Sequence, residues 1–343
     1  MSHQSTPLST FEWTPASAGV PQAETGEPLS ELLSSLTEDR ASSAAELVRR
    51  TARTCHGWLV GSSCVDAGAG VALRQGLDEF LESQGWRGPV DRFRASIAAI
   101  EAAVPDDGDS ALREALAAEC ALWLETAETL AGPGWEGADE RPRLRLPDRA
   151  DCARALLEGP AAIERGEVFL VHGWSETVAR GLELVQARGL APEVIVSEGG
   201  PDLGGRRLAR RLVASGMAIR FVYDAALVAA VRRADRVWLG TDALGATDFL
   251  GRVGTSALVE RARELGVMTT LLATTDKLRP DGDVALPDWA EGEAWHLWES
   301  APRNVEVEAQ PFETVGLEWV DGVATEVGLM LSRDLQNTPL RAL

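Results

Sequence analysis

Between residues 168 and 272, short apolar runs alternate with segments of helical periodicity, and this alternation constrains the fold more than any other feature of the chain. The apolar, partly β-branched runs are Val168–Val171, Val194–Val196, Ile219–Tyr223, Val237–Leu239 and Met268–Leu272. Helical spacing fills the intervals, at about residues 175–189, 203–215, 225–234 and 252–266. Strands that alternate with helices in this way are typical of a parallel sheet wrapped by helices. We therefore expect an α/β fold class with a Rossmann-like parallel sheet.

The chain before this region has a different pattern. From Leu29 to Leu130 apolar residues recur three and four apart and β-branched residues are sparse, which predicts helices. Gly and Pro interrupt residues 132–147, which indicates a linker. Residues 1–27 are rich in Ser, Thr, Pro, Gly and Gln, a composition typical of a disordered tail. We expect a tail (1–27), a helical N-terminal domain (28–148) and a Rossmann-like domain (149–343).

The charge of the chain limits its partners. The net charge is −20, which argues against non-specific binding of DNA or RNA, because such binding needs an excess of Lys and Arg. The acidic excess lies in the two flanks, whereas residues 151–280 are nearly neutral and hold Lys277, the only lysine of the sequence. This neutral, arginine-supplied centre favours an anionic small ligand. Alternatively, the flanks are simply solvated acidic faces.

The cysteines do not indicate a metal site or a disulfide framework. Cys55, Cys64, Cys120 and Cys152 form no C-x-x-C pair, and the histidines do not cluster with them. We expect no metal and no organic cofactor. The sequence shows neither an apolar run long enough to span a membrane nor a secretory signal, so we expect no membrane association and a cytoplasmic location.

Polar residues follow each predicted strand, where a doubly wound sheet binds its ligand. They are His172–Ser175, Glu198–Arg207, Asp224, Gly240–Asp242 and Thr274–Lys277. Two predicted helices begin at the same edge, near Leu203 and Val253, and helix N-termini present free N–H groups suited to phosphate.

Each of these residues also has a structural interpretation. No complete G-x-G-x-x-G follows the first strand, so a dinucleotide fingerprint is absent. Glu198 and Asp242 could cap helices, and Arg206 and Arg207 could face solvent. His172 could be a buried, hydrogen-bonded histidine, and Trp174 could belong to the core.

Seven segments, taken in order, resemble the family that comprises methylthioribose-1-phosphate isomerase, ribose-1,5-bisphosphate isomerase and the alpha, beta and delta subunits of translation initiation factor 2B. The segments are Val168–Val178, Glu198–Arg207, Tyr223–Ala226, Gly240–Asp242, Arg252–Thr255, Thr275–Lys277 and Thr325–Gly328. The resemblance is specific from about residue 154 to residue 328 and only architectural before that.

The resemblance implies an acid–base pair in the isomerases of the family, a cysteine after the first strand and an aspartate after the fourth. Moving a proton between adjacent sugar carbons needs two such groups. Asp242 stands at the aspartate position, whereas Gly173 stands at the cysteine position, and no cysteine follows Cys152. The regulatory subunits lack the cysteine, and usually the aspartate, yet keep the pocket. The chain therefore combines features of both groups.

Two functions remain open. The first is an initiation factor 2B-like protein that binds a phosphorylated sugar or a nucleotide; the ligand-binding residues would be Gly173, Trp174, Ser175, Glu198, Arg206, Arg252 and Lys277. The second is an aldose-1-phosphate to ketose isomerase of the ribose-1-phosphate or methylthioribose-1-phosphate type. Asp242 and His172 would be its catalytic residues, or Glu198 or a water in the space beside Gly173 would assist Asp242. The resemblance also implies a homodimer formed near Asp224. The acidic, Trp-rich segment from Trp289 to Trp298 could cover an interface or close over the site.

Overall fold

A computed structural model describes residues 29–37, 44–61, 73, 76, 77, 80, 88–103, 109–124, 149–159, 162–279, 282, 284, 286, 297, 298 and 300–331. The predicted tail, the linker at 132–147 and most of the Trp-rich segment lie outside these residues. The boundary expected at residue 148 also lies outside them and stays a prediction.

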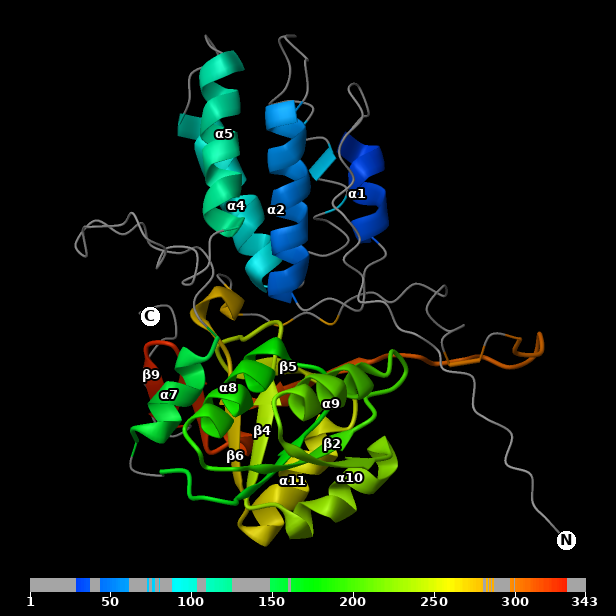
Figure 1. The fold of residues 1–343 in the computed structure, drawn as a ribbon. Helices are drawn as coiled ribbons and strands as arrows, with labels where there is room; N and C mark the ends of the chain where they lie inside the picture. The colour runs from blue at the N-terminus through cyan, green and yellow to red at the C-terminus, as the bar shows by residue number, and fades with distance from the viewer. Residues whose placement is uncertain are drawn as a thin grey trace, which may run out of the picture.

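The N-terminal part of the chain is helical, as its periodicity predicts. Its principal helices are α1 (Leu29–Thr37), α2 (Ala44–Gly61), α4 (Gly88–Ala103) and α5 (Asp109–Leu124). They enclose a core of their own, in which the edge of Trp123 meets the ring of Phe93 with centroids 5.3 Å apart. Figure 1 shows these helices standing on one side of the sheet region. We refer to them together as the helical body.

The remainder is the expected α/β fold. Its parallel core comprises β1 (Val168–Val171), β2 (Glu193–Ser197), β3 (Ala218–Val222), β4 (Arg236–Gly240), β6 (Met268–Leu272) and β8 (Gly322–Thr325), with β9 (Gly328–Leu331) added antiparallel. The order of the strands is β3-β2-β1-β4-β6-β8-β9. The chain thus winds outward from β1 to β3 and then returns to place β4 on the other side of β1. Such a reversal is a topological switch point.

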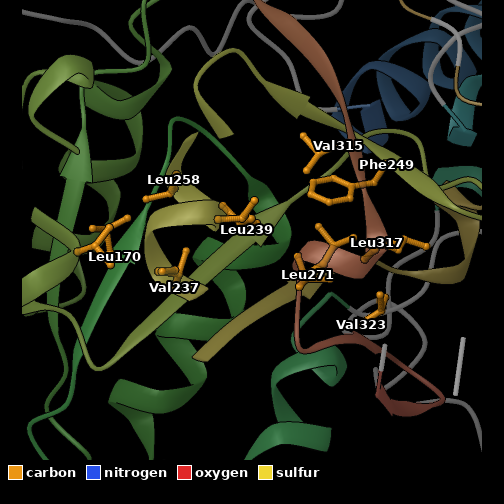
Figure 2. Close-up of a cluster of buried hydrophobic side chains, with 14 of the residues drawn as sticks. Leu170, Val237, Leu239, Phe249, Leu258, Leu271, Val315, Leu317 and Val323 are labelled. Atoms are coloured by element: carbon orange, nitrogen blue, oxygen red, sulfur yellow. The ribbon is translucent and has the colours of Figure 1, made fainter. Parts of the chain in front are cut away.

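Helices cover both faces of the sheet, and the alternation of side chains along each strand explains why. On β1, Phe169 and Val171 pack with α7 (Asp151–Leu157), α8 (Glu176–Ala187) and α9 (Gly204–Ala214). Leu170 points to the other face and packs with α10 (Asp224–Ala230) and α11 (Thr255–Leu265). Leu239 and Leu271 belong to the same hydrophobic cluster as Leu170, the second cluster of the sheet region, which Figure 2 shows. Burying one such side chain contributes roughly 1.5–3 kcal/mol.

Four strands were not predicted from the sequence: β8 and β9 at one edge of the main sheet, and two strands that lie outside it. β5 (Asp248–Arg252) pairs antiparallel with β7 (Phe312–Gly316) to form a separate two-stranded sheet. Phe249 and Val315 of this ribbon close the second cluster (Figure 2). The helical segment expected at 252–266 therefore begins later, at Thr255, because residues 248–252 belong to a strand.

None of the described helices combines the length and the apolar character that a membrane span requires.

Candidate functional site

The candidate site lies where β1 and β4 end, at the switch point of the sheet. These two strands are hydrogen-bonded neighbours whose following loops diverge to opposite halves of the fold. The β1 loop carries the predicted site residues His172, Gly173, Trp174 and Ser175, and the β4 loop carries Asp242. The sequence-based location of the site therefore coincides with the place where this topology leaves room for a ligand.

Ser175 fixes the start of α8. Its side-chain oxygen accepts a hydrogen bond from the amide of Val178, which is the ordinary role of a helix N-cap. A Cβ added at Gly240 would lie 2.0 Å from the Ser175 Oγ, so the end of β4 closely approaches this cap. Glycine at position 240 is therefore required by the packing of the β4 end on α8.

Arg252 occupies the space that a side chain at position 173 would need. Gly173 has a φ of +70°, and a Cβ built on it would lie 2.4 Å from Cδ and 2.9 Å from Nε of Arg252. The Nη2 of Arg252 donates to the carbonyls of Gly199 and Gly200, at 3.1 and 3.0 Å, and its guanidinium pairs with Asp202. The position that a Cβ at residue 173 would take is thus occupied by the Arg252 side chain, and a water beside Gly173 stays a prediction.

His172 is held on both ring nitrogens. Its Nε2 lies 2.9 Å from the carbonyl oxygen of Val253, so it donates there, and its Nδ1 lies 2.7 Å from the Ser197 hydroxyl. Burial lowers the pKa of His172, and the positive charge of Arg252 adds to this effect. The arrangement fits a neutral histidine whose Nδ1 accepts from Ser197. Both nitrogens are thus engaged by protein groups, which favours the structural interpretation of His172.

Lys277 and Asp242 form a pair next to this loop. The Lys277 Nζ lies 3.9 Å from Oδ1 of Asp242 and donates to Oγ1 of Thr177 at 3.2 Å. The lysine side chain is only 5% exposed, whereas that of Asp242 is 21% exposed and so remains accessible. Burial lowers the pKa of Lys277, and the carboxylate of Asp242 opposes that change. The single lysine of the sequence is therefore placed beside the aspartate of the predicted acid–base pair.

Sequence reasoning missed the contact of Arg149 with Asp276 behind this pair. Arg149 donates to Asp276 at 3.0 Å and lies 3.8 Å from Glu176, and both Arg149 and Asp276 are buried. Burial alone would lower the pKa of Arg149, but Asp276 and Glu176 outweigh it and raise that pKa. Arg149 and Asp276 are 127 positions apart, so no local pattern could have indicated their contact.

The β2 loop is held by Asp224, whose role was also missed. Its two carboxylate oxygens accept from the amides of Gly199 and Gly200 at 2.8 and 2.7 Å. Burial would raise the pKa of Asp224, but the hydrogen bonds from the two amides outweigh it and lower that pKa. Glu198 in this loop pairs with the half-exposed Arg206 at 3.4 Å.

Trp174 contacts an arginine of α9. The guanidinium of Arg207 stacks over its ring at 4.0 Å from the centroid, and Arg207 is in turn held by Glu46 of α2. A cation stacked on the ring face in this way typically stabilises a protein by about 0.5–2 kcal/mol. Trp174 therefore lies between the sheet region and the helical body.

Charge and helix geometry make this edge of the molecule suited to anions. α8, α9 and α11 all begin at the carboxyl edge of the sheet, where their free N–H groups carry partial positive charge. Arg252 and Lys277 add full positive charges within the same loops. Among the described residues, no group of three or more His, Cys, Asp or Glu side chains is arranged to hold a metal ion.

The fold and its switch-point site define a class of proteins, namely Rossmann-like domains that carry a helical body at the carboxyl edge of the sheet. Within that class, the chain belongs to the Initiation factor 2 subunit family, whose model matches residues 150–332. The matched region contains all seven segments on which the resemblance was based.

Known relatives include both an enzyme and initiation factor-like proteins. Ribose 1,5-bisphosphate isomerase of Thermococcus kodakarensis is 26% identical over 179 residues, which are 50% of this chain and 56% of that protein. A putative translation initiation factor eIF-2B subunit 2-like protein of Pyrococcus horikoshii is 28% identical over 185 residues, 52% of this chain and 63% of its own length. The matched region is thus only about half to two thirds of each of these relatives.

The fold extends over most of the chain. The structure of the translation initiation factor eIF-2B of Pyrococcus horikoshii OT3 superposes with a TM-score of 0.69 at 21% identity, covering 90% of this chain and 99% of that one. At this identity the similarity shows the fold alone. It extends the architectural resemblance beyond the sheet region into the helical body.

Proposed function

We propose that this chain binds a phosphorylated sugar or a nucleotide at the carboxyl edge of its sheet, as an initiation factor 2B-like protein without the thiol of the family's isomerases. One observation carries the proposal. The Arg252 side chain lies where a Cβ at position 173 would be, so a side chain at that position would have to displace it. A fixed cation thus stands where the isomerases have an acid–base group.

Charge supports an anionic ligand. Lys277, Arg252 and the N-termini of three helices lie at this edge of a chain whose net charge is −20. Phosphate oxygens accept hydrogen bonds from arginine, lysine and helix N–H groups. In the proposed complex, Lys277 and Arg252 bind phosphate, and Asp242 accepts a hydrogen bond from a sugar hydroxyl.

The second candidate is an isomerase, and Asp242 favours it. This carboxylate keeps partial exposure and a lysine neighbour, as an acid–base group with access to substrate would. Its partner would have to be a group other than His172, whose two nitrogens are engaged. Relatives named ribose 1,5-bisphosphate isomerase give this candidate its substrate class.

One experiment separates the two functions. The protein is incubated with ribose 1-phosphate, ribose 1,5-bisphosphate and methylthioribose 1-phosphate, ketose formation is followed by NMR, and thermal unfolding is recorded with each compound. We expect no turnover and a raised melting temperature with at least one compound. At about 100 times the dissociation constant, a ligand stabilises the folded state by roughly 2.7 kcal/mol.

Variants assign the result to the site. Lys277→Ala should abolish the rise in melting temperature, whereas Glu260→Gln, which changes an exposed carboxylate on α11, should preserve it. Turnover that is lost in Asp242→Asn and kept in Glu260→Gln would establish the isomerase instead. If none of the phosphorylated sugars and no nucleotide raises the melting temperature, the proposal is wrong.

The proposal includes a homodimer in the cytoplasm. β3 is an edge strand, and beside Asp224 it leaves Phe221 and Tyr223 46% and 75% exposed, which supports a second copy as the partner of this edge. Cys55, Cys120 and Cys152 are free and buried, which agrees with a reducing compartment.

A further inference from the structure

Two residues of α2 contact the sheet region close to the candidate site. Glu46 and Arg49 lie three positions apart and therefore on one face of the helix. Glu46 accepts two hydrogen bonds of 2.8 Å from Arg207, and Arg49 donates to both carboxylate oxygens of Glu176 at 3.0 and 3.2 Å. The charges of the two contacts are opposite, so the two pairs together favour one orientation of α2.

The two contacts differ in the residues to which they connect within the sheet region. Arg207 stacks on Trp174 of the β1 loop. Glu176, in contrast, is 11% exposed and also lies 3.8 Å from Arg149, which donates to Asp276 at 3.0 Å. Asp276 immediately precedes Lys277, and its negative charge raises the pKa of Lys277 against the effect of burial. A continuous series of charges thus runs from the helical body to the Lys277–Asp242 pair.

The series is balanced in charge. Its positive and negative members alternate in the order Arg49, Glu176, Arg149, Asp276, Lys277, Asp242. The exposed fraction of the side chain falls from 26% at Arg49 to 0% at Asp276. Buried charges depend on their partners far more than exposed ones. Asp276 Oδ1 has no hydrogen-bond partner among the described residues, so its charge is available to Lys277.

We propose that Arg49 is a positioning residue for the Lys277–Asp242 pair and acts on it through Glu176, Arg149 and Asp276. This proposal deepens the proposed function, because that function assigns Lys277 to ligand phosphate. The helical body then does more than cover the sheet: its docking sets the charge that faces the ligand. If Arg49 loses its charge, Glu176 draws Arg149 toward itself, Asp276 is less neutralised, and Lys277 holds its proton more tightly.

The single lysine of the sequence makes the test direct. Protein labelled with 13C at the lysine ε-carbon gives one lysine signal, and the change of that signal with pH reports the ionisation of Lys277 without any ligand. Other groups also face this amine. They are Asp242 on the β4 loop, Arg149 just before α7, Cys152 on α7, Thr177 on α8, and Asp276. They are the same in every variant of Arg49.

We expect Arg49→Gln to raise the titration midpoint of the lysine signal by about half a pH unit, and Arg49→Lys to restore it. Glu176→Gln should lower the midpoint, because Arg149 then neutralises Asp276 more fully. Two variants serve as controls. Glu46→Gln breaks the other contact between α2 and the sheet region, and Arg53→Gln removes a positive charge from an exposed position of the same helix.

The outcomes decide between a positioning role and a merely structural one. An unchanged midpoint in Arg49→Gln, or an equal change in Glu46→Gln or Arg53→Gln, would overturn the proposal. Binding of ribose 1,5-bisphosphate gives a second readout, for which we expect a several-fold loss of affinity in Arg49→Gln and none in Arg53→Gln. If the unaltered protein binds no phosphorylated sugar, the proposed function fails, while the lysine titration still decides the role of Arg49.

Discussion

The residue at position 173 restricts the side chain of Arg252, which lies beside it in the fold. Gly173 has a φ of +70°, a region that costs other residues about 1–2 kcal/mol, and the stem of Arg252 lies where its Cβ would be. The absence of a side chain at position 173 and the course of the Arg252 side chain are therefore one structural fact.

We expect Gly173→Cys to lower the free energy of unfolding by about 3 kcal/mol, because it adds backbone strain and displaces Arg252. Arg252→Ala alone should cost about 1 kcal/mol through the lost contacts with Asp202 and the two carbonyls. The double variant should be about 1 kcal/mol more stable than the sum of the two single effects predicts, because without the Arg252 side chain the cysteine at position 173 has nothing to displace. Urea unfolding of the four proteins measures this coupling, and additive effects would show that the two positions do not compete for space.

Among the structural elements, five strands of the parallel core could be predicted from sequence, whereas β8, β9 and the ribbon of β5 and β7 could not. β1 and β2 are continuous apolar runs, as strands covered on both faces should be. β5 reads Asp-Phe-Leu-Gly-Arg, has charges at both ends, and finds its partner more than sixty residues later, so no local signal marks it. The same limit applies to the site. The residues at strand ends could be listed, but the contacts of Arg252 with Gly173 and of Arg149 with Asp276 depend on the tertiary fold.

Two glycines in helices should respond in opposite ways to alanine. Gly205 lies in the first turn of α9, where a Cβ would come within 1.7 Å of the Ser197 carbonyl oxygen at the end of β2. Because this neighbour is a backbone atom that cannot rotate away, Gly205→Ala should lower the free energy of unfolding by at least about 3 kcal/mol. Gly57 of α2 is exposed with nothing within 4 Å, so Gly57→Ala should stabilise by about 0.5–1 kcal/mol. Chemical denaturation measures both, and a Gly205→Ala protein as stable as the original would contradict the close approach of α9 to β2.

At the scale of the whole molecule, the helical body and the sheet region have separate cores joined by charged contacts. The hydrophobic clusters of the two parts share no residue, whereas Arg49–Glu176 and Glu46–Arg207 cross between them. Ion pairs of partly exposed side chains contribute little stability, typically below about 1 kcal/mol each. They do specify orientation, since each contact matches one charge with its opposite. The relative placement of the two parts therefore depends on polar groups that also adjoin the site.

The last prediction concerns the assembly of two chains. β3 lies at one edge of the sheet and is only partly covered, since Phe221 on the strand is 46% exposed and Tyr223 just after it is 75% exposed. An open edge with exposed aromatic residues is an unusual surface for a protein that stays monomeric. We expect the protein to sediment as a dimer, and Tyr223→Arg to weaken dimerisation at least about tenfold by placing a charge in the interface. Val327→Arg is the matched control, because Val327 is 60% exposed near the opposite edge, between β8 and β9. Sedimentation velocity over a range of concentrations measures both, and either a monomeric protein or equal effects of the two substitutions would exclude β3 as the interface.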